Sequence, residues 1–121
     1  MNWFKRSFGA VLLIAAASFP FMPRADAGRR EGPTTTLGSV PGQQSVSYTM
    51  TLLEGEAVIG VQGNGYGNLD LVVADSDGNV TVGRGSSDRK IATVDVYRAG
   101  TFRIVVRNRA QWPNDFRLLT N

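Results

Sequence analysis

Residues 45–52 read Ser-Val-Ser-Tyr-Thr-Met-Thr-Leu, with an apolar or aromatic side chain at every second position and a hydroxyl-bearing residue between them. Successive side chains of a β-strand point to opposite faces of the sheet. This period of two therefore predicts a strand that buries one face and exposes the other. The segment contains neither glycine nor proline to interrupt such a strand. It sets the expectation of an all-β protein.

The same alternation continues toward the C-terminus. Further strands are predicted at residues 57–61, 69–73, 80–82, 91–97, 102–106 and 116–118. In the strand that begins at residue 102 we expect Phe102, Ile104 and Val106 inward and Arg103 and Arg107 outward. Residues 75–79 suit a hairpin turn, and residues 83–87 suit a loop. Seven or eight short strands at this spacing predict an antiparallel β-sandwich or jelly roll.

The first 27 residues have the layout of a secretory signal peptide. Lys5 and Arg6 precede an apolar run, and residues 25–27 (Ala-Asp-Ala) supply the small residues that a signal peptidase accepts. The run is shorter than the roughly 20 residues of a membrane span, which argues against the alternative of a membrane anchor. We expect cleavage after Ala27, a secreted or periplasmic product, and no membrane segment in that product.

After the expected cleavage, residues 28–42 are a polar, turn-rich leader that we predict to be flexible, and residues 43–121 are the sandwich domain. The sequence contains no cysteine, so this small domain must fold without disulfides. Cleavage removes three of the 13 basic residues and one of the 10 acidic residues, which leaves 10 and 9 and a net charge of +1. A balance this close to neutral argues against a nucleic-acid partner.

Three segments carry a family resemblance. They are residues 68–78 (Asn-Leu-Asp-Leu-Val-Val-Ala-Asp-Ser-Asp-Gly), 99–106 (Ala-Gly-Thr-Phe-Arg-Ile-Val-Val) and 114–119 (Asn-Asp-Phe-Arg-Leu-Leu). In this order and spacing they resemble the bacterial pre-peptidase C-terminal domain. Members of that family show an Asp-Leu strand with a glycine turn, an Ala-Gly-Thr-Tyr strand and a closing Tyr-x-Leu strand. Phe102 and Phe116 stand here where the family has tyrosine.

The resemblance spans roughly residues 40–120 and implies a jelly-roll sandwich with a non-catalytic accessory role. Members of the family occur behind secreted proteases and help secretion. Some relatives bind insoluble polymers such as collagen or chitin, and some collagen-binding relatives use calcium. The partner that the resemblance implies is thus an exported protein or an extracellular polymer.

The residue inventory argues against an enzyme. The sequence contains no histidine and no cysteine, which excludes Ser-His and Cys-His nucleophile systems and zinc sites built on imidazole or thiolate. The carboxylates Asp75 and Asp77 share a predicted turn rather than a cleft that would shift their pKa values. We predict no catalytic residues.

One calcium candidate remains. Asp75, Asp77 and Asn79 place oxygen ligands at alternate positions of the predicted hairpin, and such oxygens suit Ca²⁺. The alternative is that these side chains bond the local backbone, as Asp and Asn commonly do in turns. No other cofactor is predicted. The glycine-rich loop over residues 63–68 is not followed by a helix, so we expect a flexible connection rather than a phosphate-binding loop.

A candidate partner surface involves basic and aromatic side chains. The candidate residues are Arg103, Arg107, Arg109, Trp112 and Tyr66. Arg103 and Arg107 share a strand face because an even number of residues separates them, and Arg117 is expected on a neighbouring strand. Such a surface suits an anionic glycan or an acidic protein. The alternative is an ordinary solvated sheet face, with arginines paired to residues such as Asp95 or Asp115.

Together these features predict a secreted or periplasmic β-sandwich that acts as a non-enzymatic binding or accessory module. It would contact a protein or polymer through its sheet faces and loops. The alternative is a secretion or folding aid for another exported protein, with no ligand of its own.

Overall fold

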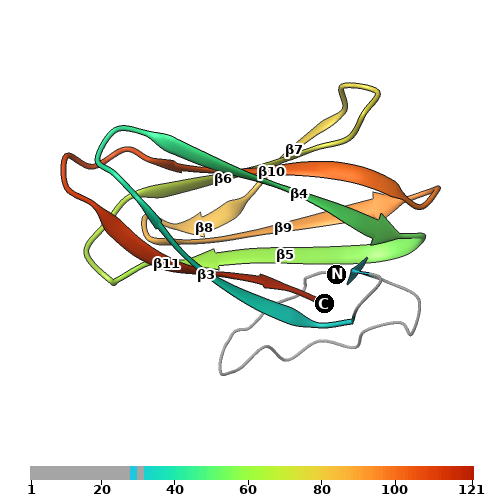
Figure 1. Cartoon of the computed structure of the whole chain (residues 1–121), viewed down its shortest axis with the longest axis horizontal. Helices are drawn as coiled ribbons and strands as arrows, with labels where there is room; N and C mark the ends of the chain where they lie inside the picture. The colour runs from blue at the N-terminus through green and yellow to red at the C-terminus, as the bar shows by residue number, and fades with distance from the viewer. Residues whose placement is uncertain (1–27, 30–31) are drawn as a thin grey trace.

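The computed structural model describes residues 28–29 and 32–121, which form two antiparallel sheets packed face to face (Figure 1). In chain order the strands are β2 (Gly28–Arg29), β3 (Thr34–Val40), β4 (Ser45–Leu53), β5 (Gly55–Gln62), β6 (Leu69–Ala74), β7 (Val80–Val82), β8 (Arg84–Ser86), β9 (Arg89–Val96), β10 (Gly100–Asn108) and β11 (Asn114–Thr120). The predicted signal peptide, residues 1–27, lies outside the described residues. Within the described ranges no helix is long and apolar enough to cross a membrane.

The strand order is that of a jelly roll. One five-stranded sheet has the order β2-β4-β10-β6-β7, and the other has the order β3-β11-β5-β9-β8. Most connections cross between the sheets, so strands distant in sequence pair with each other: β4 with β10, and β3 with β11. Two sheets joined by such crossings are typical of a jelly roll. The prediction of an antiparallel β-sandwich is confirmed.

The core lies between the two sheets, and the predicted alternation supplies it. Met50 and Leu52 of β4 are buried, while the threonines beside them are exposed. On β10 Phe102, Ile104 and Val106 face the core, and Arg103 and Arg107 face outward, as predicted. The buried cluster consists of Val40, Met50, Leu52, Ala57, Ile59, Val61, Leu69, Leu71, Val73, Ala92, Val96, Phe102, Ile104, Val106, Phe116 and Leu118.

The structure corrects the prediction of a flexible leader over Thr34–Val40. This segment is β3, and it pairs with β11 from Thr34↔Thr120 to Val40↔Asn114. The sequence shows no apolar alternation here because the side chains at most of the inward positions, Thr34, Thr36 and Gly38, are small. A Cβ atom at Gly38 would lie 2.4 Å from Tyr48 Oη and 2.6 Å from Phe116 Cζ. The rings of Phe116, from the adjacent strand, and Tyr48, from the opposite sheet, fill the space that a large side chain of β3 would need.

Those two rings also join the sheets. Tyr48 of β4 and Phe116 of β11 meet edge to face, with their centroids 6.4 Å apart and their planes at 83°. Aromatic pairs favour this geometry because the positive ring edge faces the negative ring surface. Each sheet therefore contributes one ring to a contact that fixes how the sheets sit on each other.

The structure also corrects the predicted loop over residues 83–87. Arg84–Ser86 form β8, which pairs with β9 from Arg84↔Ile91 to Ser86↔Arg89. The short strands β2 and β8 raise the number of strands in the described residues above the seven or eight expected. β8 consists of Arg84, Gly85 and Ser86 and has no apolar residue, so its sequence carries no strand signal, whereas the two valines of β7 gave one.

Candidate functional site

One end of the sandwich gathers four connections, those between β3 and β4, β5 and β6, β8 and β9, and β10 and β11 (Figure 1, left). Backbone hydrogen bonds tie them together. Gln43 N donates to Ala110 O at 2.9 Å, and Arg109 N donates to Asn68 O at 2.8 Å. The loop between β10 and β11 is thus bonded to the two connections on either side of it.

The side chain of Asn108, which is fully buried, holds this loop in place. Its Nδ2 donates to the carbonyl oxygens of Val40, Pro41 and Trp112, at 3.2, 3.3 and 2.7 Å. Its Oδ1 accepts a hydrogen bond from Ala110 N at 3.0 Å. Buried polar groups are normally satisfied in this way, and here the partners are all loop or strand-end backbone. The amide therefore fixes the backbone that carries Trp112.

A second buried pair organises the glycine-rich loop. Asn114 Nδ2 donates to Asp88 Oδ1 at 2.9 Å, and Asp88 Oδ2 accepts from the backbone N–H of Gly65. Asp88 is 8% exposed and Asn114 is 1% exposed. A Cβ atom at Gly67 would lie 1.8 Å from Asn114 Nδ2, so a side chain there would displace the pair. The prediction of a flexible connection does not fit this arrangement, because the glycines let the backbone close on two buried polar side chains.

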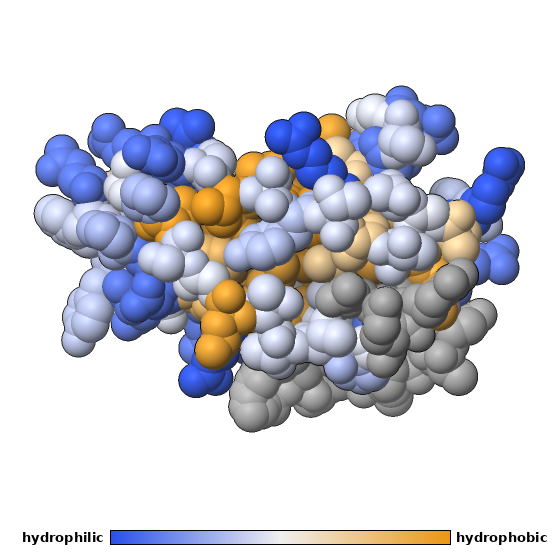
Figure 2. All heavy atoms as spheres, viewed as in Figure 1, coloured by the Kyte–Doolittle hydropathy of each residue, from blue (hydrophilic) through white to orange (hydrophobic). Residues whose placement is uncertain are grey.

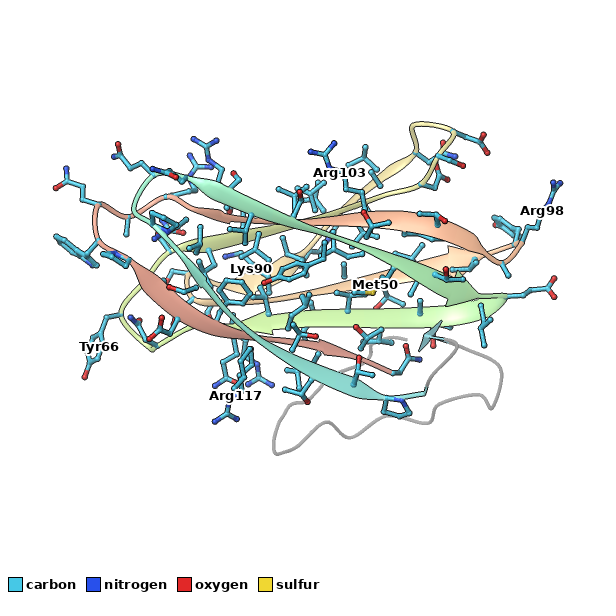
Figure 3. The ribbon with its side chains drawn as sticks, in the orientation of Figure 1. Met50, Tyr66, Lys90, Arg98, Arg103 and Arg117 are labelled. Carbon is cyan, nitrogen blue, oxygen red and sulfur yellow. The ribbon has the colours of Figure 1, made fainter. Side chains whose placement is uncertain are left out.

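Four of the five candidate partner-binding residues lie at this end. Trp112 is 59% exposed and Tyr66 is 88% exposed, and Figure 3 shows Tyr66 pointing away from the sandwich. Arg107 lies near the end of β10, and Arg109 follows that strand. Arg103 is apart from them, because it lies opposite Thr49 and Ala74 in the middle of its sheet. We call Tyr66, Arg107, Arg109 and Trp112 the loop-end surface.

Arg117 does not join this surface. It lies on β11, between Leu37 of β3 and Gln62 of β5, in the other sheet. Arg103 and Arg117 therefore point from opposite faces of the molecule (Figure 3). The expectation of a neighbouring strand is wrong because consecutive strands cross between sheets in this topology.

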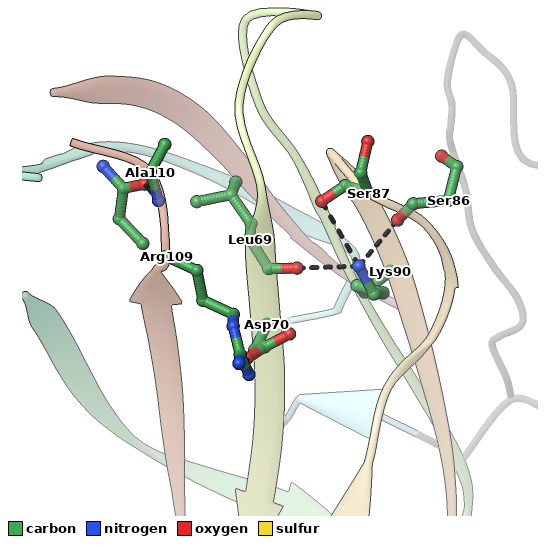
Figure 4. Close-up of polar contacts among 8 residues, drawn as sticks. Leu69, Asp70, Ser86, Ser87, Lys90, Arg109 and Ala110 are labelled. Carbon is green, nitrogen blue, oxygen red and sulfur yellow. Dashed lines mark hydrogen bonds and ion pairs between the residues drawn. The ribbon is translucent and has the colours of Figure 1, made fainter. Parts of the chain in front are cut away.

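The arginines of the loop-end surface differ in their surroundings. Arg109 Nη1 forms an ion pair with Asp70 Oδ2 at 3.0 Å, rather than with Asp95 or Asp115 (Figure 4). Arg107 lies opposite Asp70 in the register of β10 and β6, yet it has no ion-pair partner within the part of the chain that is described. Among the described residues its side chain is exposed on the outer face of β10.

Lys90 holds the connection between β8 and β9 against β6. Its Nζ donates to the carbonyl oxygens of Leu69, Ser86 and Ser87 at 2.8, 2.6 and 3.3 Å (Figure 4). An ammonium group has three donors, and these three acceptors satisfy all of them. Lys90 thus has a structural role in positioning the β8–β9 connection, which carries Asp88.

The calcium candidates form a hairpin turn at the opposite end. Asp75 Oδ1 accepts from the backbone N–H groups of Asp77 and Asn79, and Asp75 Oδ2 accepts from Asn79 Nδ2, each at 2.9 Å. These hydrogen bonds lower the pKa of Asp75 from its ordinary value of 3.8. The bond from the Asn79 side chain has the largest effect, and the backbone bonds add to it. Both oxygens of Asp75 are thus used within the turn. Across residues 32–121 no three His, Cys, Asp or Glu side chains gather as metal ligands do.

A cleft of about 750 Å³ lies beside this turn, between the β6–β7 hairpin and the end of β9. Figure 2 shows the tip of the hairpin as a hydrophilic lobe at the upper right that stands away from the body of the molecule. The ionisable residues that line the cleft are Asp75, Asp77, Asp95, Tyr97 and Arg98.

No protein-family model matches the chain, and a search of curated proteins finds no match. The fold and the site therefore define the class of protein on their own: an antiparallel jelly roll whose loops at one end are held by buried polar side chains. The resemblance to the pre-peptidase C-terminal domain stays a prediction carried by three short segments.

Three residues that organise the site were missed, although the sequence contained a signal for them. Asn108 continues the inward phase of β10, Asn114 shares the inward phase of Phe116, and Lys90 shares the inward phase of β9. A polar residue in the inward phase of a strand predicts a buried group with hydrogen-bond partners. Asp88 had no such signal, because it lies in a turn where aspartate is common.

Proposed function

We propose that this protein is a non-catalytic, exported binding or accessory module that contacts a protein or a polymer through its loop-end surface. The observation that carries the proposal is the combination of an exposed indole ring with a fixed backbone at Trp112. The ring is 59% exposed, whereas the carbonyl of the same residue accepts a 2.7 Å hydrogen bond from buried Asn108.

A fixed backbone under an exposed aromatic ring favours binding. Ordering a loop on association costs free energy, and a loop that is ordered beforehand avoids that cost. Aromatic side chains add a large contact area with few rotatable bonds, which is why they are enriched in binding surfaces. Folding gains little from an indole ring left in water. These points support contact with a partner as the role of Trp112.

The charges at the same end of the sandwich indicate what the partner carries. Arg107 is unpaired among the described residues, and Arg109 is held by Asp70 at 3.0 Å. A guanidinium group binds carboxylate, sulfate or phosphate through two parallel hydrogen bonds. The balance of 10 basic and 9 acidic residues that remains after the expected signal cleavage gives no long-range attraction for nucleic acid. An anionic glycan or an acidic protein surface suits this local basic patch.

The proposal is tested by capture on the purified protein. Immobilised protein is incubated with the envelope and secreted fractions of the source organism, with and without calcium, and compared with the variants Trp112→Ala and Arg107→Ala. Leu37→Ala is the matched control, because Leu37 is 76% exposed but lies on β3 in the other sheet. We expect saturable capture by the parent and the control, and at least about a tenfold weaker capture by Trp112→Ala, as for an interface hot spot.

Equal capture by the parent and Trp112→Ala would contradict the loop-end surface as the binding site. No saturable capture in either fraction would favour the alternative of a secretion or folding aid without a ligand. Calcium dependence of the capture would return Asp75, Asp77 and Asn79 to consideration as a metal site.

A further inference from the structure

In the sheet that contains β9, part of this strand has no neighbouring strand on one side among the described residues. β5 pairs with the whole of β9, from Gly55↔Val96 to Gln62↔Arg89. On the other side, β8 pairs only from Ser86↔Arg89 to Arg84↔Ile91. Within the described part of the chain, residues 92–96 therefore have a strand on one side only. The free side of such an edge presents N–H and C=O groups that another strand can pair with.

The cleft of about 750 Å³ lies along this free edge. Residues 93–97 line one side of it, and the β6–β7 hairpin lines the other. The lining also includes Val73, Val96 and Phe102, which belong to the buried core. A strand placed here would pair with β9 through its backbone and would pack every second side chain against the core.

The cleft is acidic. Asp75, Asp77 and Asp95 line it, against a single basic side chain, Arg98, which points outward at the end of the sandwich (Figure 3). The excess of carboxylates attracts a basic partner and repels an acidic one. It also disfavours a second copy of this chain at the same edge, because two such copies would bring their carboxylates together.

We propose that this cleft binds an extended peptide in which basic and apolar residues alternate, as an added strand on residues 92–96 in line with β8. Strand addition of this kind takes affinity from main-chain hydrogen bonds and specificity from alternate side chains. Here the apolar side chains face Val73 and Phe102, and the basic ones lie on the outer face of the sheet beside Asp95, while the hairpin that carries Asp77 adds to the negative charge of the cleft. The site lies at the opposite end from the loop-end surface. This proposal therefore goes beyond the proposed function, and the two are tested independently.

The probe is a blocked seven-residue peptide of alternating arginine and valine, titrated into the purified protein and followed by amide chemical shifts and amide hydrogen exchange. We expect shift changes centred on residues 92–97 and slower exchange of amides within residues 92–96. A matched peptide N-methylated at alternate residues lacks the backbone donors for pairing, and a peptide with glutamate in place of arginine lacks the charge. Both are expected to bind at least about tenfold more weakly.

Substitutions of the acidic residues test how the carboxylates of the cleft contribute to peptide binding. Asp95→Asn is expected to weaken binding of the arginine–valine peptide by about threefold, as for an exposed ion pair. The double variant Asp77→Asn/Asp95→Asn is expected to weaken it further, because it also lowers the negative charge of the cleft. Asp115→Asn is the matched control, since it removes the same charge from the exposed face of β11 and should leave the affinity unchanged. Asp75 is left intact because its oxygens build the turn.

Equal binding of the N-methylated peptide, or shift changes away from β9, would overturn the proposal. So would a free protein that sediments as a dimer and loses that dimer on Asp77→Asn or Asp95→Asn substitution, because a second copy would then occupy the edge.

Discussion

Asn108 shows how one residue can belong to the core by position and to a loop by its contacts. It follows Phe102, Ile104 and Val106 in the inward phase of β10, but its amide is bonded to four backbone groups of the β3–β4 and β10–β11 connections. A polar group buried without partners is costly, so the core tolerates this amide only with those bonds in place. The loop structure and the stability of the sandwich are therefore linked at this residue.

Substitution of Asn108 by alanine tests that link. The change removes the hydrogen bonds that the amide makes with the carbonyls of Val40, Pro41 and Trp112 and with the N–H of Ala110, and we expect a loss of about 3 kcal/mol in the free energy of unfolding. Asn68→Ala is the control, because its side chain is exposed and should cost less than about 0.5 kcal/mol. Urea denaturation of both variants gives the comparison, and equal midpoints for the two would refute the role given to Asn108.

The lowered pKa of Asp75 leads to a prediction about how stability depends on pH. Hydrogen bonds in the turn favour its charged form and hold its folded pKa below the ordinary value of 3.8. Because the pKa is lower in the folded chain, the carboxylate adds stability above pH 3.8, and that contribution is lost as the pH falls through the folded value. In Asn79→Ala the largest cause is removed, so the pKa of Asp75 should rise toward 3.8. A carbon-detected NMR titration of both proteins measures this, and an unchanged pKa would mean that the side-chain bond is absent in solution.

At the scale of elements, the sequence predicted strands well where each strand carries its own apolar residues. β4 and β10 supply inward side chains at every second position, and their alternation alone sets which face is buried. β3 has small inward residues and depends on rings from β4 and β11, so its own sequence resembles a loop. Sheet membership was not predictable either, since the alternation on β11 does not say on which side of the sandwich Arg117 lies.

Gly38 tests the packing of β3. The substitution Gly38→Ala places a methyl group where Phe116 and Tyr48 already lie, and overpacking of this kind should cost about 2 kcal/mol in unfolding free energy. In the Phe116→Leu variant the ring atoms are absent, so the Gly38→Ala substitution should cost about 1 kcal/mol less than in the parent. A double-mutant cycle measures this difference as the interaction energy between the two positions. Ser39→Ala, at the exposed neighbouring position, is the control. Additive effects of the two changes would show that β3 does not pack beneath the ring.

At the scale of the whole molecule, the jelly roll places the chemistry of the chain at its two ends. One end carries exposed aromatic and basic side chains on β10 and on loops that buried Asn108, Asp88 and Asn114 hold in place. The other end carries an acidic cleft beside the free edge of β9. Composition and motifs predicted the class of fold, and the four residues of the loop-end surface were among the candidates chosen from the sequence. They missed the supporting side chains and the cleft, because both arise only when segments distant in sequence meet.

The central claim is that buried polar side chains turn the loop end into a fixed surface before any partner binds. Backbone ¹⁵N relaxation of the purified protein tests it most directly, through the order parameters of residues 63–68 and 109–113. The account predicts values of about 0.8 or higher, close to those of the strands, whereas values below about 0.6 would mean flexible loops and would contradict it.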